Sequence, residues 1–149
     1  MSSAPGTTGP EPVVRITTRA HFSAAHRLHN EARDEAWNRA VFGKCNNPFS
    51  HGHTYALEVT VEGPVDPERG WVLDFADLRR IVAEKIVRRC DLKNLNTDVP
   101  FLAGVNPTAE NIAVRMWDEL AGEFSPARLV RIVLHETERN KVVYSGPEK

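Results

Sequence analysis

The stretch that decides the fold and the site is Gly43-Lys44-Cys45-Asn46-Asn47-Pro48-Phe49-Ser50-His51-Gly52-His53. The residues that follow, 54–62, predict a strand that begins near His51. Residues two apart on a strand point to the same face, so His51 and His53 can bind one ion. Neutral imidazole nitrogens suit zinc, and a catalytic zinc commonly has three protein ligands and one open position.

The third ligand of such a site must come from elsewhere in the chain. Upstream, His26 and His29 stand at the end of another extended run. His21 precedes them, but strand alternation puts it on the face opposite His26, so it ranks last. The alternative is structural: two strand histidines that face solvent and one core histidine with an internal hydrogen bond.

Composition places the chain among ordinary globular proteins. Its 149 residues fit one domain, and 41% hydrophobic residues are enough for a core. A net charge of -1 disfavours a nucleic-acid-binding surface, and no run approaches the ~20 apolar residues of a membrane span. Residues 1–12, rich in Ser, Thr, Gly and Pro, are expected to be a disordered tail rather than a secretory signal, and 13–149 to be the domain.

The pattern of the domain predicts an α+β fold in the order ββααββ. Asp74 and Thr108 are good N-caps for two amphipathic helices, the first with a stripe from Phe75 to Ile86. A shorter helix is expected within 31–41. After the turn formers at 63–70, residues 71–73 are expected to return along the sheet. The four main strands are predicted at 13–25, 51–62, 129–137 and 142–144.

The two cysteines differ in their surroundings. Cys45 can be a fourth metal ligand or a separate reactive thiol, because a nearby dication and imidazoles favour the thiolate. Its spacing does not decide between these roles, and the structural alternative is a small buried hydrophobe. Cys90 has no histidine near it in sequence, which favours the structural role. Two cysteines so far apart indicate a reduced, cytoplasmic protein.

Glu136 is a carboxylate in an otherwise apolar strand. Alternation places it on the same face as Leu134, and a buried carboxylate must be paired or hydrogen-bonded. A ligand with a guanidine-like edge would pair with it well. The structural alternative is an internal partner such as Arg131 or Arg139. Asp91, at a boundary between helix and loop, has a local cap as its structural role.

Together these residues identify a family resemblance. The chain resembles the 6-pyruvoyl-tetrahydropterin synthase and 6-carboxytetrahydropterin synthase group, and it is more similar to the pyruvoyl enzymes in the run 42–48 and the turn at 138–140. The motifs run in the family's order from 13 to 145. They are Phe22-Ser23-Ala24-Ala25-His26-Arg27-Leu28, Phe42-Gly43-Lys44-Cys45-Asn46-Asn47-Pro48, His51-Gly52-His53, Asp91 with Lys93-Asn94-Leu95, Thr108 with Glu110-Asn111, and Glu136-Thr137.

The resemblance implies a tunnelling fold, in which a four-stranded antiparallel sheet carries two helices on one face. Three such sheets close a barrel and two trimers stack into a hexamer, with active sites at subunit interfaces. It also implies zinc on His26, His51 and His53, and it implies a phosphate-eliminating lyase that acts on 7,8-dihydroneopterin triphosphate.

The resemblance further implies the roles of the remaining site residues. Glu136 would bind the amino-pyrimidine edge of the pterin, helped by Thr108 and Glu110. Cys45 would remove a proton, with Asp91 as its catalytic partner. Triphosphate would leave by elimination, and tautomerisation would give 6-pyruvoyl-tetrahydropterin.

One position departs from the family pattern. The family places an Asp-His pair before Lys-Asn-Leu, and that histidine relays protons with the cysteine, whereas here the pair is Asp91-Leu92. Leucine cannot carry a proton, and His135 is expected on the strand face opposite Glu136. Two alternatives therefore stay open. One is a different outcome on the same substrate, the carboxy product or side-chain cleavage, and the other is a pterin-binding paralogue of low activity.

Overall fold

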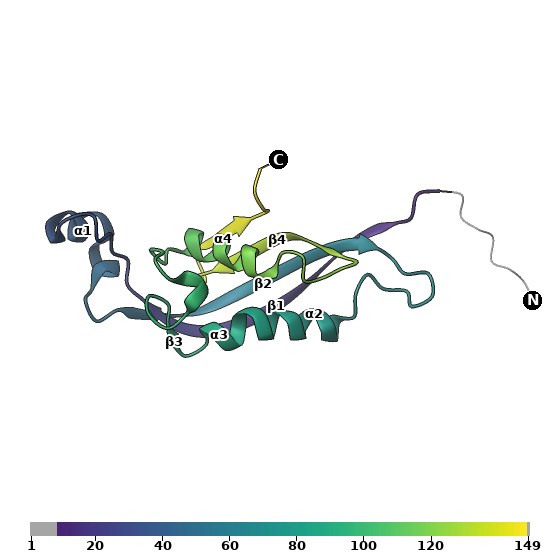
Figure 1. Cartoon of the computed structure of the whole chain (residues 1–149), viewed down its shortest axis with the longest axis horizontal. Coiled ribbons are helices and arrows are strands. Elements are labelled where there is room, and N and C mark those ends of the chain that lie inside the picture. The colour runs from purple at the N-terminus through teal and green to yellow at the C-terminus, as the bar shows by residue number, and fades with distance from the viewer. Residues whose placement is uncertain (1–8, 149) are drawn as a thin grey trace, which may run out of the picture.

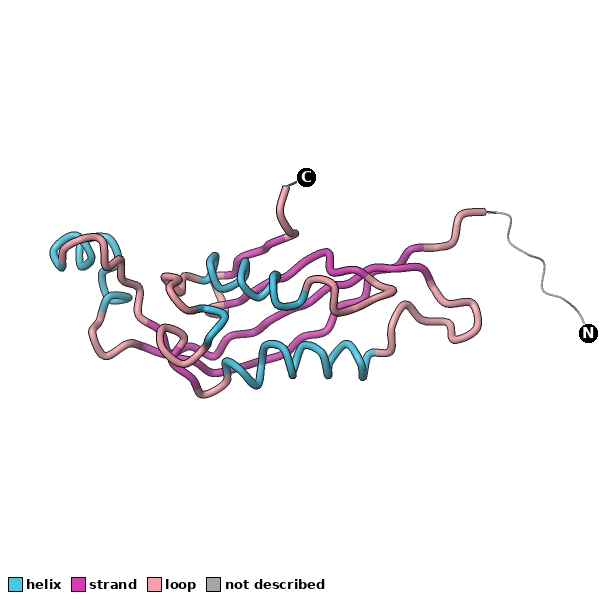
Figure 2. The backbone as a smooth tube through the Cα atoms, in the orientation of Figure 1, coloured by secondary structure: helices cyan, strands magenta, loops and turns pink. Residues whose placement is uncertain are grey.

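The computed structural model describes residues 9–148, and its centre is one five-stranded sheet in the order β3-β1-β2-β4-β5 (Figures 1 and 2). The four long strands pair antiparallel, as predicted, and the two-residue β3 adds to the edge of β1 in parallel. The strands are β1 (Val13–His26), β2 (His51–Pro64), β3 (Lys93–Asn94), β4 (Arg128–His135) and β5 (Lys141–Tyr144).

The β1–β2 ladder carries the site. Its register runs without a break from Val13 opposite Pro64 to His26 opposite His51. Along β1, Phe22 and His26 are buried whereas His21 is exposed, so the predicted alternation is confirmed. The ladder therefore delivers alternate side chains to the core, and the last of these are histidines.

The helices cover one face of the sheet (Figure 1). The first is a continuous rod made of α2 (Phe75–Val82), a π-helical turn η2 (Ala83–Val87) and α3 (Arg88–Cys90). Asp74 caps it by accepting from the backbone N–H of Ala76 at 2.9 Å. The predicted stripe is buried from Leu78 onward, but Phe75 is 50% exposed because it lies in the first turn, beyond the core.

Helix α4 (Ala109–Leu120) also begins where the sequence predicts. The Thr108 hydroxyl accepts from the backbone N–H of Asn111 at 3.2 Å. Ile112 and Met116 are fully buried against the sheet, and Trp117 packs edge-on against Tyr144 with ring centroids 5.4 Å apart. Both helices therefore anchor on the face that also carries the histidines.

The expected strand at 71–73 is wrong. The segment is irregular, because β2 already pairs with β1 on one side and with β4 on the other, so no free edge remains beside it. The turn before this segment is instead closed by Asp66, whose Oδ1 accepts from the backbone N–H groups of Glu68 and Arg69 at 2.8 and 2.9 Å. Val72 is buried and anchors the segment in front of Asp74.

An arm inserted between β1 and β2 projects from one end of the sheet, at the left of Figure 1. It contains α1 (Glu35–Phe42), close to the predicted short helix, and a 3-10 turn η1 (Gly43–Asn46). Asp34 caps α1 by accepting from the backbone N–H of Trp37 at 2.8 Å. The arm brings Cys45 back to the end of β1, where the backbone N–H of Leu28 donates to the Cys45 carbonyl at 2.8 Å.

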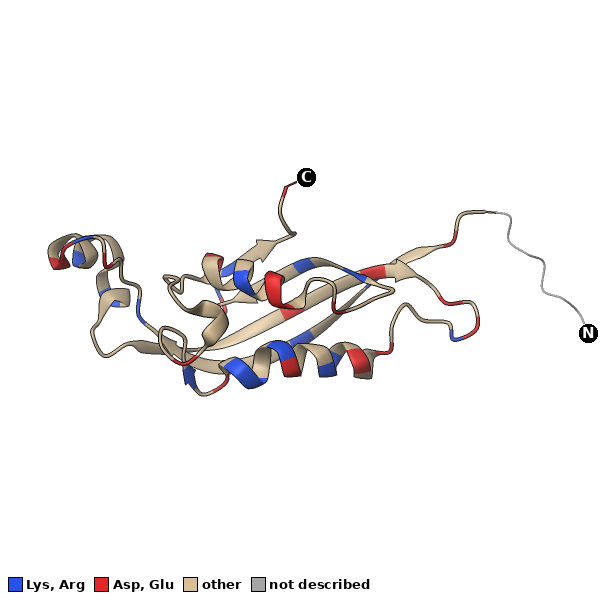
Figure 3. Cartoon of the chain, in the orientation of Figure 1, with Lys and Arg blue, Asp and Glu red and all other residues tan. Residues whose placement is uncertain are grey.

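Within the described residues the second face of the sheet carries no helix, and it is polar. Thr17 and Thr60 share a hydrogen bond of 2.7 Å across β1 and β2, and His135 Nε2 pairs with Glu58 at 2.7 Å. Figure 3 shows charged residues of both signs along the strands and along the outer side of α2. No helix within residues 9–148 combines the length and the apolarity that a membrane crossing requires.

The expected tail falls mainly outside the described residues. Positions 1–8 are not described, and 9–12 carry no regular secondary structure. The Pro12 carbonyl accepts from the backbone N–H of Val65 at 3.2 Å, which ties the start of β1 to the turn after β2.

Candidate metal centre and catalytic site

Three histidines converge at the end of the β1–β2 ladder. His26 and His51 are direct cross-strand partners, and His53 lies two residues along on the same face. Their ring centroids are 4.6 to 5.0 Å apart, and one nitrogen of each lies within 4.8 Å of the other two. The predicted set of three is therefore confirmed as a cluster that could hold a metal ion.

Hydrogen bonds fix how His26 presents its ring. Its Nδ1–H donates to the Pro107 carbonyl at 2.8 Å, with the Tyr55 hydroxyl 3.3 Å from the same nitrogen. A carbonyl can only accept, so the proton of the neutral ring is on Nδ1 and the lone pair is on Nε2. That lone pair points into the cluster, where His26 Nε2 lies 3.0 Å from His51 Nε2.

The two remaining rings leave buried nitrogens without partners. His51 Nδ1 and His53 Nε2 are inaccessible to solvent, and no hydrogen bond reaches them from the described residues. Buried polar atoms are rarely left unpaired, and a metal ion is one of the few partners that could satisfy them. Three imidazoles with an open side fit a tetrahedral metal with one free position.

Burial favours the neutral, metal-binding form of His26 and His51. Desolvation lowers the pKa of His26, and the hydrogen bond to the Pro107 carbonyl opposes this only in part. Desolvation likewise lowers the pKa of His51, with the neighbouring His53 as a second cause. A ligand that is already deprotonated loses nothing to proton release when it binds a metal.

Glu136 stands beside the cluster, as its predicted strand face requires. It directly follows β4, and its Oε1 lies 3.7 Å from His53 Nε2. The internal arginine partner that the sequence left open does not form: among the described residues, His53 is the only basic group within 4.0 Å of this carboxylate. His135 lies on the other face with Glu58, so it is not near the cluster.

Cys45 lies on the neighbouring arm and is half-buried. Within the described chain, the group close enough to share one ion contains the three histidines without Cys45, which leaves it as a separate thiol. His29, the rival third ligand, is held elsewhere, since its Nδ1 accepts from Asn46 Nδ2 at 2.9 Å. Cys90 is fully buried, and burial raises its pKa to about 12, as expected of a structural cysteine.

Asp91 and Leu92 lie beside the edge of β1 and are not part of this cluster. Asp91 Oδ1 accepts from the backbone N–H of Ser23 at 2.9 Å, and Ser23 points to the helix-free face. Leu92 is 83% exposed and has a φ of 59°, in the left-handed region that side chains rarely adopt. The chain by itself therefore does not bring Asp91 to His26, His51 and His53.

Thr108 and Glu110 lie on the segment that follows Pro107. Thr108 is half-buried and caps α4, and Glu110 is exposed in the first turn of that helix. Sequence reasoning missed Pro107 and Tyr55, the two groups that touch His26 Nδ1. Tyr55 could have been found, because it continues the same-face alternation of His51 and His53.

The sheet with helices on one face and a histidine cluster at the end of its first strand pair are the features of a tunnelling-fold enzyme. The family described as 6-pyruvoyl tetrahydropterin synthase matches residues 15–147. The chain belongs to this family.

Named relatives agree over nearly the whole chain. The 6-pyruvoyl tetrahydrobiopterin synthase of Poecilia reticulata is 43% identical over 146 residues, which are 98% of this chain and 99% of that protein. The Homo sapiens protein of the same name is 43% identical over 132 residues, 89% of this chain and 91% of its own. The structure of Caenorhabditis elegans 6-pyruvoyl tetrahydropterin synthase superposes with a TM-score of 0.86 at 38% identity, covering 92% of this chain and 98% of that one.

Proposed function

We propose that the protein is a zinc-dependent lyase that converts 7,8-dihydroneopterin triphosphate to 6-pyruvoyl-tetrahydropterin. The observation that carries the proposal is the pairing of a metal-ready histidine cluster with a free carboxylate 3.7 Å from His53. Within residues 9–148 no lysine or arginine pairs with Glu136, so this carboxylate is suited to the two N–H donors of an amino-pyrimidine edge. The cluster and the carboxylate together define where a pterin ring and its side chain would lie.

The residues divide the work as follows. Glu136 would orient the pterin, with Thr108 and Glu110 beside the pocket. Bound zinc would supply Lewis acidity toward the side-chain hydroxyls of the substrate, which acidifies the adjacent C–H. The Cys45 thiolate would take that proton, the C–O bond to triphosphate would break as the electron pair moves into the new double bond, and tautomerisation would give the pyruvoyl group.

A hexamer completes the proposal. Asp91 is not part of the histidine cluster of its own chain, so a catalytic role would require a neighbouring copy to bring its histidines to this edge. The edge strands β3 and β5 are available for pairing between subunits, and edge strands are normally paired or covered. Closure of a barrel by three sheets would pair these edge strands and would also bring a neighbouring copy to Asp91. We expect the assembly to act in the cytoplasm on a small-molecule substrate.

A specific observation favours a second candidate, a pterin-binding protein of low activity. Leu92 stands where the family's relay histidine is expected, and its exposed side chain has no proton to give. Retention of Cys45 argues for turnover, because pterin binding alone does not need a thiol.

Product analysis tests the proposal. Purified protein loaded with zinc is incubated with 7,8-dihydroneopterin triphosphate, and products are separated by chromatography and identified by mass. We expect inorganic triphosphate and 6-pyruvoyl-tetrahydropterin, both lost in Cys45→Ala. A carboxy product or a cleaved side chain would replace the assigned reaction, and tight pterin binding without any product would establish the low-activity alternative.

A further inference from the structure

A cavity lies beside the histidine cluster, between the arm and the loop that leads to α4. Its volume is about 770 Å³ and its walls are mainly polar. Ser50, which precedes His51, and Asn106, which precedes Pro107, both line it, so it opens next to the metal centre. The basic side chains on its wall are Arg27 and His29.

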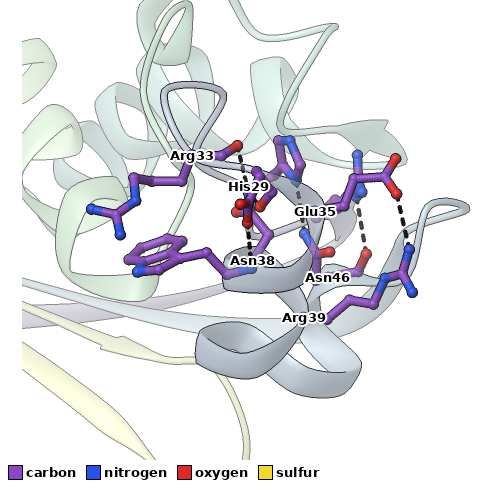
Figure 4. A network of polar contacts seen from close by, with 9 residues as sticks. His29, Arg33, Glu35, Asn38, Arg39 and Asn46 are labelled. Atoms are coloured by element: carbon purple, nitrogen blue, oxygen red, sulfur yellow. Dashed lines mark hydrogen bonds and ion pairs between the residues drawn. The ribbon is translucent and has the colours of Figure 1, made fainter.

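Asparagine side chains hold this wall rigidly, one for each backbone position from 27 to 30. Asn46 and Asn38 are buried, and Figure 4 shows the part of this network on the arm. The bonds are Arg27 N to Asn96 Oδ1 at 2.8 Å, Asn46 Nδ2 to Leu28 O at 2.7 Å, His29 N to Asn106 Oδ1 at 3.1 Å, and Asn30 N to Asn38 Oδ1 at 2.7 Å. A wall fixed in this way does not have to be ordered when a ligand binds.

The same network makes His29 a hydrogen-bond donor. Asn46 Nδ2 donates to the Leu28 carbonyl, which identifies that atom as the amide nitrogen. Its second hydrogen therefore points to His29 Nδ1 at 2.9 Å, so Nδ1 accepts. In a neutral ring the proton is then on Nε2, and the cavity wall carries an N–H group at this position.

Arg27 supplies the charge of the wall. Its Nε donates to the Asn46 carbonyl at 3.1 Å, which orients the guanidinium. Among residues 9–148 no carboxylate forms an ion pair with it, although Glu31 also lines the cavity. A planar guanidinium without a carboxylate partner is suited to phosphate oxygens.

We infer that this cavity binds the polyphosphate tail of the substrate, with Arg27 and the His29 N–H as its donors; the inference rests on the proposed function for the identity of the substrate. The tail would then leave beside the candidate base, because the Leu28 N–H between the two donors is bonded to the Cys45 carbonyl at 2.8 Å. Arg27 and His29 would thus hold the leaving group while Cys45 takes the proton.

Inorganic tripolyphosphate is the probe, and calorimetric titration of the metal-loaded protein at low salt gives its affinity. Metal content is measured before and after, because tripolyphosphate also chelates divalent ions. Arg27→Gln should weaken binding about 10- to 100-fold, the range for charged hydrogen bonds. The matched control Arg33→Gln removes the same charge from the same arm but outside the cavity, where Arg33 stacks on Trp37, and should change affinity less than about twofold.

Two further variants complete the test. Glu31→Gln removes the acidic group on the wall and should tighten tripolyphosphate binding. His29→Phe keeps a flat ring but has no N–H donor, and it should also weaken tripolyphosphate binding. It tests the site independently if Arg27→Gln disturbs the arm. Both Arg27→Gln and His29→Phe should bind dihydroneopterin, which has no phosphates, as the natural protein does.

The outcomes separate this inference from the proposed function. The inference is overturned if tripolyphosphate does not bind at millimolar concentration. It is also overturned if Arg27→Gln and His29→Phe both bind tripolyphosphate with the affinity of the natural protein, even if pyruvoyl product forms. Tripolyphosphate binding that depends on Arg27, without any product from the pterin triphosphate, supports the anion site and refutes the proposed reaction.

Discussion

Replacement of Asn38 by alanine should loosen the arm without unfolding the sheet. Asn38 is 0% exposed, and its side chain ties together the start of the arm (Figure 4). Its Oδ1 accepts from the backbone N–H of Asn30 at 2.7 Å, and its Nδ2 donates to the carbonyls of Asn30 at 3.0 Å and Asp34 at 2.9 Å. Alanine removes these three bonds and leaves their backbone partners to be satisfied by water.

The structure sets the size of the effect. A hydrogen bond of this kind contributes about 1 kcal/mol net, so three give about 2–4 kcal/mol. This corresponds to an opening equilibrium about 30 to 1,000 times more favourable. Strands β1 and β2 make their own ladder outside the arm, so the cost should fall on local opening of residues 28–46.

Hydrogen exchange followed by mass spectrometry measures this opening peptide by peptide. Peptides from 28–46 should exchange faster by that factor in Asn38→Ala, while peptides from β1 and β2 keep their protection. Arg39→Ala is the control, because it removes only the exposed Arg39–Glu35 pair of 2.9 Å and should change exchange about two- to threefold at most. Equal protection of the arm in both variants would refute the argument that Asn38 holds it.

Three further expectations follow from other parts of the molecule. His51→Ala should remove the bound metal, measured by elemental analysis, whereas His21→Ala on the opposite face should keep it; full retention in both would contradict the centre. Leu92→His should raise kcat by about tenfold or more and leave pterin affinity unchanged, and no gain would mean that another group carries the proton. The hydrogen bond from His135 lowers the pKa of the Glu58 carboxyl in the folded state. As the pH falls below about 4.3, the unfolded state therefore binds more protons than the folded state, and the folded state loses stability. In Glu58→Gln the thermal midpoint should depend less on pH across that range.

The metal centre could be predicted because it depends on local periodicity. His51 and His53 are two apart on a strand, so alternation puts them on one face, while the choice of His26 over His29 as the third ligand comes from the family resemblance. The caps Asp74 and Thr108 are equally local, and both were predicted from their side chains.

The remaining features depend on contacts that no local pattern encodes. The Pro107 carbonyl lies 81 positions from His26 and is a backbone group. No side chain in the sequence therefore indicates that this position binds the His26 ring. The segment 71–73 has strand-like residues, but the sheet offers it no free edge. Asp91 is recognisable by motif, yet its direction depends on how the helix rod meets β1.

Because His26 and His51 are cross-strand partners, the two ends of the arm between them meet at adjacent backbone positions although 25 positions separate the residues. An insert whose ends already lie together can change in length at small entropic cost, since loop closure grows only logarithmically with length. The arm is thus a modular unit attached beside the histidine cluster. Chimaeras that exchange residues 27–50 between homologues would transfer Arg27, His29 and the Cys45 thiol together, whereas Asn96 and Asn106, which hold the backbone at 27 and 29, would stay with the sheet and its histidines.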